Sequence, residues 1–379
     1  MRRELERLEI LDEHEARDRS WEVVRAAFEE REPATPRARS WRPLAVLVAV
    51  AALAAAFLSP PGRSVVDSLR QAIGVEGAEP ALFSLPADGQ LLVSSEAGAW
   101  VVRADGSRRR LGEYTEAAWS PFGNFVVAAS RNELAALEPD GDVRWRLSRP
   151  NVSLPRWGGT RTDTRIAYQS GRSLRVVAGD GRGDRQLAEN VRAVAPAWRP
   201  GGGHVVAFVG RRDVVVTDVD ARRVRSRFRA PANVVRLEWA RDGQHLLVQA
   251  RHSLRVHTPE GHVRFDLLGR DAAPIETAAM SPSGTSLAFV QTGGGQSHLW
   301  LIPRLAPDAS AARRVFTGAG RFTDLAWSPD GRWLLLGWRD ADQWVFVRSE
   351  RVRALRAVDD ISSQFDGAYP GVDGWCCAR

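Results

Sequence analysis

The sequence repeats itself with a period of roughly 40 residues. A large apolar residue, usually tryptophan, recurs along the chain, and most copies carry a glycine four residues later. These repeat anchors are Leu85, Trp119, Trp157, Trp198, Trp239, Met280 and Trp327. An internal period of this length is the signature of architectures built from stacked repeats. We therefore expect a series of similar units rather than one unrepeated core.

Each repeat combines its anchor with a tight turn and apolar strands. The clearest copy reads Trp327-Ser-Pro-Asp-Gly331, in which proline presets φ and glycine can adopt a positive φ. A second column of turns follows in register, at Asp105-Gly106, Asp140-Gly141, Asp180-Gly181, Asp220-Ala221 and Glu260-Gly261. Two turn columns separate four antiparallel strands per repeat, which is the content of a propeller blade.

The fold class predicted is thus all-β: a β-propeller of four-stranded antiparallel blades, preceded by a short helical segment and one transmembrane helix. Seven blades are expected, with six as the alternative. The blade number stays open because the third copy, Trp157-Gly-Gly-Thr-Arg161, lacks the glycine at the fourth place and the sixth copy is longer than the others.

The motif at Trp327, with its relatives at Trp119, Trp198, Trp239 and Met280, resembles the WD-like propeller repeat of the TolB-like family. The resemblance covers about residues 81 to 360. It implies a propeller fold and does not specify a ligand.

Charge and cysteine content narrow the classes of function. All 53 basic residues are arginine and the net charge is +7, but the arginines are scattered beside 46 acidic residues, so no nucleic-acid partner is expected. The two cysteines, Cys376 and Cys377, are adjacent, which excludes a disulfide network between distant segments. They form either a vicinal disulfide or two thiols, and their role stays open.

An apolar segment divides the chain. Residues 44–58 contain no charge, and with their flanks they are long enough for a marginal membrane span at 43–59. A cleaved signal peptide is the rival interpretation, but the long charged segment before it favours an uncleaved anchor. Arginines crowd its N-terminal side, so we expect a single-pass protein of the cell membrane with a cytoplasmic N-terminus.

The predicted domains are a cytoplasmic charged amphipathic segment at 1–42, the membrane helix at 43–59, a juxtamembrane helix and linker at 60–78, and an extracytoplasmic propeller at 79–379. Residues 4–32 carry apolar residues at helical spacing, which indicates a helix pair that is either frayed or bound to a cytosolic protein. This layout is similar to that of bacterial membrane-bound anti-sigma factors, although His14 has no Cys-x-x-Cys partner. The resemblance implies a sigma factor as the cytosolic partner.

A search for catalytic motifs finds none. The chain has no nucleophile elbow of the G-x-S-x-G type, no HExxH, and no phosphate-binding loop of the GxxxxGK[ST] type. His204 and His245 occupy equivalent repeat positions, which keeps a metal-dependent lyase open as an alternative. No metal or other cofactor is expected, and the protein is predicted not to be an enzyme.

If a ligand binds the propeller, the mouth of its central channel is the default location. Four polar residues stand three places before their anchors, where the inner strands begin, and are candidate ligand-binding residues: Glu116, Arg236, Thr277 and Asp324. The alternative is that they only satisfy one another around the axis. The loops of the sixth repeat, at 293–295 and 305–312, form another candidate contact surface.

The sequence therefore predicts a membrane-anchored binding or sensing module for an extracytoplasmic protein, peptide or glycan, with a possible signal to a cytosolic partner. An envelope assembly scaffold and a propeller lyase or hydrolase are the alternatives. The identity of the ligand and the oligomeric state do not follow from the sequence.

Overall fold

The computed structural model describes residues 84–268, 273–305, 312–350 and 355–377. The predicted segments at 1–42, 43–59 and 60–78 lie outside these residues. Within the described part of the chain, no helix is both long and apolar enough to cross a membrane.

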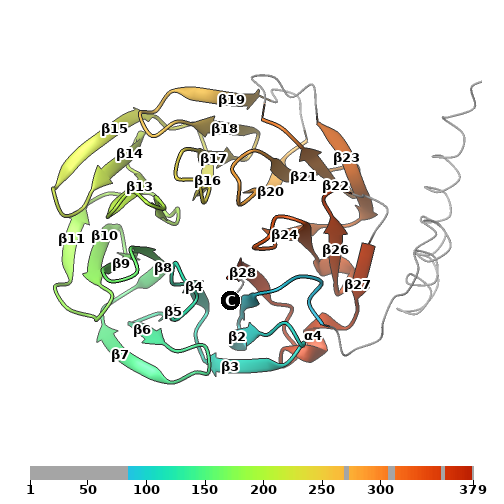
Figure 1. Ribbon diagram of the computed structural model, residues 1–379, viewed down its shortest axis with the longest axis horizontal. Helices are drawn as coiled ribbons and strands as arrows, with labels where there is room; N and C mark the ends of the chain where they lie inside the picture. Colours follow the sequence, from blue (N-terminus) through green and yellow to red (C-terminus); the bar gives the residue numbers. More distant parts are fainter. Residues whose placement is uncertain (1–83, 269–272, 306–311, 351–354, 378–379) are drawn as a thin grey trace, which may run out of the picture. The chain divides into compact units, whose positions relative to one another are not determined.

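The described strands form seven four-stranded antiparallel sheets arranged as blades around a central axis (Figure 1). Seven blades, rather than six, are thereby confirmed. In each blade the strands are given from the inner to the outer edge. Blade 1 has β28 (Gly371–Cys376), β1 (Gln90–Ser95), β2 (Gly98–Val102) and β3 (Arg108–Gly112). Blade 2 has β4 (Glu116–Trp119), β5 (Val126–Ser130), β6 (Glu133–Leu137) and β7 (Val143–Ser148). Blade 3 has β8 (Val152–Gly159), β9 (Thr164–Ser170), β10 (Ser173–Ala178) and β11 (Arg185–Ala188).

Blade 4 has β12 (Ala197–Trp198), β13 (Val205–Val209), β14 (Asp213–Asp218) and β15 (Arg223–Arg229). Blade 5 has β16 (Val234–Trp239), β17 (Leu246–Ala250), β18 (Ser253–His257) and β19 (Val263–Leu268). Blade 6 has β20 (Ile275–Met280), β21 (Leu287–Gly293), β22 (Gln296–Ile302) and β23 (Arg313–Ala319). Blade 7 has β24 (Phe322–Trp327), β25 (Trp333–Trp338), β26 (Gln343–Arg348) and β27 (Leu355–Val358). Two short helices, η2 (Arg339–Ala341) and α4 (Ile361–Gln364), complete the described elements.

The ring closes through the C-terminal strand. In Figure 1 the red β28 lies beside the cyan strands of blade 1, and it pairs antiparallel with β1 so that Trp375 faces Leu91. Trp327 faces Leu334 in the same way, so Trp375 holds the anchor position of blade 1. The prediction that Leu85 is an anchor is wrong, because β28 already occupies the inner edge of the blade. Leu85 instead donates its backbone N–H to Ala104 O, 2.8 Å away, and buries its side chain in the core between blades 7 and 1.

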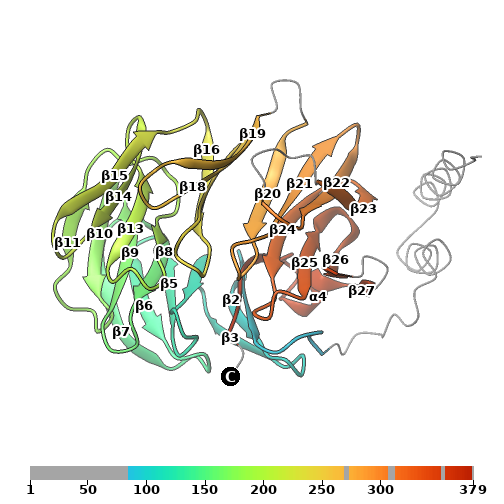
Figure 2. The same cartoon turned by 45° about the horizontal axis from the view of Figure 1, so that its top comes forward.

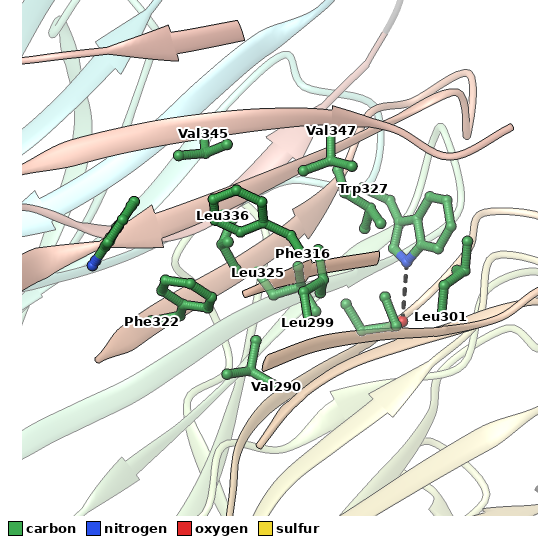
Figure 3. Packing of buried hydrophobic residues seen from close by; sticks show 14 residues of the cluster. Val290, Leu299, Leu301, Phe316, Phe322, Leu325, Trp327, Leu336, Val345 and Val347 are labelled. Atoms are coloured by element: carbon green, nitrogen blue, oxygen red, sulfur yellow. Dashed lines mark hydrogen bonds between the residues drawn. The ribbon is translucent and has the colours of Figure 1, made fainter. Parts of the chain in front are cut away.

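The core of the propeller lies between neighbouring blades. Seven clusters of buried apolar side chains are described, and each one combines residues from two adjacent blades. Figure 3 shows the cluster between blades 6 and 7, in which the Trp327 indole N–H donates to Ala279 O at 3.0 Å. Trp198 makes the equivalent bond to Arg156 O of blade 3 at 2.9 Å. An anchor tryptophan thus fills the space between two blades and can also fasten its blade to the one before.

Because successive antiparallel strands reverse direction, the turns of every blade fall on two opposite faces (Figure 2). We call the face where the inner strands end the anchor-turn face, since the turn after each anchor lies there together with the turn between the third and fourth strands. The opposite face, where the inner strands begin, is the start face. The two turn columns predicted from the sequence therefore share one face of the ring.

Candidate functional site

A hollow of about 990 Å³ opens on the anchor-turn face. It is bordered by turns and strand ends from six of the seven blades, and blade 6 is the exception. The residues that border it are Gln90, Arg103, Trp119, Pro121, Phe122, Gly123, Asn124, Glu138, Pro139, Asp140, Trp157, Gly158, Gly159, Arg161, Trp198, Arg199, Pro200, Gly201, Arg241, Pro329, Cys376 and Cys377. Its volume is in the range of a ligand pocket.

The border of the hollow is cationic. It holds four arginines, Arg103, Arg161, Arg199 and Arg241, against the two carboxylates of Glu138 and Asp140. One of the two carboxylates is already engaged, because Glu138 forms an ion pair of 3.1 Å with Arg144 on the rim of blade 2. Arg103, Arg161 and Arg241 are exposed, and none of them forms an ion pair with another described residue.

Two of these arginines are held in place by aromatic rings. The Arg161 guanidinium lies 4.8 Å from the ring centre of Phe122, which is 37 % exposed. Arg199 lies 5.6 Å from the ring of Trp239 and donates its Nε–H to Gly243 O at 2.7 Å. Such stacking restrains a guanidinium without neutralising its charge, so both side chains are ordered cations.

Three tryptophans border the hollow, and two of them expose little of their rings, while Trp119 is half-buried. Trp157 is 8 % exposed and Trp198 is 9 % exposed, because each is inserted between two blades. Gly158 explains part of this packing: a Cβ atom there would collide with the Trp198 indole. Gly158 is therefore a packing requirement of the next anchor, whereas Gly159 has a positive φ of 116°.

Cys376 and Cys377 form a vicinal disulfide at the edge of the hollow. They follow Trp375 directly and so occupy the place that Ser-Pro takes after Trp119 and Trp327. Gly123 packs against the pair, since a Cβ atom there would come within 3.1 Å of Cys377 Sγ.

Two of the four ligand-binding residues predicted from the sequence form ties between blades. Asp324 on β24 accepts the backbone N–H of Val372 on β28 at 3.0 Å, and the Thr323 hydroxyl donates to its other oxygen. Glu116 on β4 accepts the backbone N–H of Leu154 on β8. Both carboxylates thus hold a neighbouring inner strand in place.

The other two predicted residues differ from each other. Arg236 forms an ion pair of 2.9 Å with Glu238 of its own strand, and both border a second cavity of about 260 Å³ in the channel. Thr277 is buried in β20 and borders neither cavity. Arg236, Thr277 and Asp324 each follow a break in strand register, and a bulge of this kind re-aims the side chain beside it. Glu116, Arg236 and Asp324 thus have partners within the propeller.

The channel also contains charged residues that the sequence analysis missed. Arg156 on β8 and Asp373 on β28 interact electrostatically across the axis, together with Glu116 and Arg236. Burial raises the pKa of Asp373 from 3.8 to about 7, although a hydrogen bond to the side chain of Ser94 and the charge of Arg156 oppose the shift. Burial also raises the pKa of Asp324 above its ordinary value.

The two histidines considered for metal binding are occupied by local contacts. His204 interacts through Nδ1 with the Asp220 carboxylate, and its Nε2 lies 3.0 Å from Asp163 O. His245 Nδ1 lies 2.6 Å from the Asp242 carboxylate. Across the ranges that the structure describes, no group of three or more His, Cys, Asp and Glu residues is arranged to hold a metal ion.

The predicted mouth of the channel and the observed hollow lie at opposite ends of the inner strands. The sixth-repeat loop at 293–295 forms the turn between β21 and β22 on the start face and does not border the hollow. Most of the other predicted loop, at 306–311, lies outside the described residues. A signal for the hollow was present in the sequence, because blades 3, 4 and 5 carry arginine in the turn after the anchor.

Comparison with known proteins places the fold but not the activity. No family model matches the chain, and no curated protein matches it either. Solved structures do match. The C-terminal WD40 domain of Sif2 shares 14% identity with a TM-score of 0.53, covering 76% of this chain and 87% of that chain. A putative 6-phosphogluconolactonase from Bacteroides uniformis shares 13% identity with a TM-score of 0.53, covering 72% and 98%. Hsv2 from Kluyveromyces lactis shares 15% identity with a TM-score of 0.52, covering 71% and 93%.

At these identities the likeness defines the fold alone. The protein is a seven-bladed β-propeller that resembles WD40 and 6-phosphogluconolactonase-type propellers. The fold by itself does not specify a function.

Proposed function

We propose that the protein is a binding module that holds a segment of a partner protein in the hollow of its anchor-turn face. The observation that carries this proposal is the hollow of about 990 Å³, bordered by six blades. Its border combines exposed arginines, the half-exposed ring of Phe122 and several backbone turns. A peptide segment needs this combination of charge, apolar contact and hydrogen-bonding groups.

The border of the hollow favours binding over catalysis. None of the described residues that border it is His, Ser, Thr or Tyr, and one of its two carboxylates, Glu138, is held in an ion pair. Nucleophilic or general acid–base chemistry requires such a group with a partner at hydrogen-bond distance. The hollow offers instead a fixed surface of complementary charge.

The aromatic residues favour a peptide over a glycan. Sugar rings are held largely by stacking on exposed aromatic faces, but Trp157 and Trp198 are each less than a tenth exposed and Trp119 is half-buried. The Arg161 guanidinium already occupies one face of the Phe122 ring, although the ring as a whole stays 37 % exposed. A peptide does not need an exposed aromatic platform and can use the charged groups and backbone turns.

The proposed place of action is outside the cell membrane. It rests on the apolar segment at 43–59 and on the arginines before it, as argued from the sequence. In the same proposal residues 4–32 bind a cytosolic protein, such as a sigma factor, and pass on the signal. Protease treatment of intact cells is expected to degrade the propeller and spare the N-terminal segment. Protection of the propeller would contradict this arrangement.

The binding proposal is tested by filling the hollow. The full chain, purified in detergent, is used to select peptides from a randomised display library, and the affinities of the selected peptides are then measured. Asn124 is exposed at the border of the hollow, and Asn124→Trp is expected to weaken their binding by about tenfold or more.

The matched control is Asn132→Trp. Asn132 is exposed in the same blade but lies in the turn between β5 and β6, on the start face. This variant is expected to bind the peptides as the wild type does. Equal binding by all three proteins, or loss only in Asn132→Trp, would overturn the proposal.

A further inference from the structure

We propose that the segment held in the hollow is acidic and that its carboxylates are recognised by Arg161, Arg199 and Arg241. This inference rests on the proposed function and names the chemistry of the partner.

The first support is a change of turn chemistry in three consecutive blades. Blades 2, 6 and 7 follow their anchor with Ser-Pro, and the serine hydroxyl closes the turn on itself. Ser120, Ser281 and Ser328 each accept the backbone N–H of the residue five places later, at 2.9 to 3.0 Å. Each of these bonds stabilises its turn.

Blades 3, 4 and 5 lack this serine. The position after the anchor is Gly158, Arg199 and Ala240, so the hydroxyl acceptor is lost in all three turns. Each of these turns carries an arginine within four residues of its anchor instead. Arg199 compensates within the fold, because its Nε–H donates to Gly243 O of blade 5. Arg161 and Arg241 have no such hydrogen bond or ion pair with a described residue, so a role outside the fold best explains their place in these turns.

The second support is that the three guanidiniums border one hollow. Arg161 and Arg241 are exposed and form no ion pair with a described residue, while Arg199 is fixed by Gly243 O and the ring of Trp239. A planar guanidinium binds a carboxylate through two parallel N–H···O bonds, which gives directional recognition. An arc of three such groups fits a segment with several Asp or Glu side chains.

The opposing charges at the border are too few to neutralise this arc. Glu138 is paired with Arg144, and Asp140 is the remaining carboxylate. A basic segment would therefore meet repulsion, whereas an acidic segment would exchange the solvation of its carboxylates for charge-assisted hydrogen bonds.

The experiment is charge reversal with the same display library and the full chain. The double variant Arg161→Glu/Arg241→Glu is compared with the wild type and with Arg227→Glu/Arg229→Glu. The latter pair is exposed on the outer strand β15, away from the hollow, and carries the same change of charge. Thermal midpoints of all proteins are measured, and Arg161→Gln/Arg241→Gln serves as a milder variant if the reversal lowers the midpoint.

The wild type and the Arg227→Glu/Arg229→Glu control are expected to select peptides rich in Asp and Glu. The Arg161→Glu/Arg241→Glu protein is expected to lose about tenfold or more in affinity for these peptides and to select Lys- and Arg-rich ones. Neutral or basic peptides selected by the wild type, or acidic peptides bound equally by the reversed variant, would overturn the inference. If Asn124→Trp still abolishes binding in that case, the proposed function stands without the acidic partner; if it does not, both fail.

Discussion

The two ends of the inner strands use charged side chains in different ways. At the start of the strands, Glu116 and Asp324 accept backbone N–H groups from a neighbouring blade and so help to hold the ring. At the end of the strands, Arg161 and Arg241 border the hollow as exposed cations without an ion-pair partner among the described residues. Nearness to the axis therefore does not by itself mark a ligand site. The useful distinction is whether the fold already supplies the partner of a charged group.

The largest loss of stability is expected at the closing strand β28. Trp375→Ala removes a side chain that is 5 % exposed and stacks edge-on against Phe346 at 5.7 Å. Removal of a buried tryptophan costs about 3–5 kcal/mol, so we expect a large fall in the free energy of unfolding. Denaturant unfolding measures this, with Val224→Ala on the outer strand β15, where the side chain is 47 % exposed, as the control. A loss in Trp375→Ala no larger than that of the control would show that β28 does not close the ring as described.

A smaller loss of stability is expected at Asp324. Asp324→Ala leaves the Val372 N–H without its acceptor and should lower the free energy of unfolding by about 1–3 kcal/mol. Asp324→Asn keeps an acceptor oxygen in place and should cost less. The backbone amides of residues 371–376 should exchange hydrogen faster in Asp324→Ala than in the wild type. Unchanged stability in Asp324→Ala would mean that this carboxylate is not a structural tie.

The buried carboxyl of Asp373 predicts a pH dependence of stability. Its pKa is about 7 in the folded protein and 3.8 ordinarily, so between these values the folded state keeps a proton that the unfolded state has lost. The free energy of unfolding should therefore fall as pH rises from about 4 to about 7 and should change little through this group above that. Asp373→Asn should remove this part of the slope. An identical pH profile in wild type and variant would contradict the assignment.

The smallest effect on stability is expected in the hollow. Arg161→Gln and Arg241→Gln replace exposed side chains outside the core and should each change the free energy of unfolding by less than about 0.5 kcal/mol. Their effect should appear in ligand affinity instead. A substantial loss of stability in either variant would mean that these arginines belong to the fold, as Glu116 and Asp324 do.

Much of the fold could be predicted from local signals. The anchors and the two turn columns repeat within one chain segment, so four strands per blade follow from the sequence. The closing strand could not be predicted in the same way, because Gly371–Cys376 pairs with Gln90–Ser95 across the whole length of the ring. The turn motif after Trp375 could not be recognised either, because Cys376-Cys377 stands where Ser-Pro follows the anchor in blades 2, 6 and 7.

The sequence predicted polar residues near the axis of the ring but not the arginines of the hollow. The polar column at Glu116, Arg236, Thr277 and Asp324 was visible as a pattern, but its internal partners were not, because Leu154 and Val372 come from other blades. The arginines of the hollow stand at different distances from their anchors, so no single column contains them. Only the assembled ring brings Arg161, Arg199 and Arg241 to one border.

The central claim is that the ligand lies on the anchor-turn face. A selected peptide carrying a photoreactive group is crosslinked to the full chain, and the attachment sites are read by mass spectrometry. We predict attachment within 121–124, 158–161 and 199–201, which border the hollow. Attachment at the start-face turns, at 131–132, 171–172 and 211–212, would contradict the account.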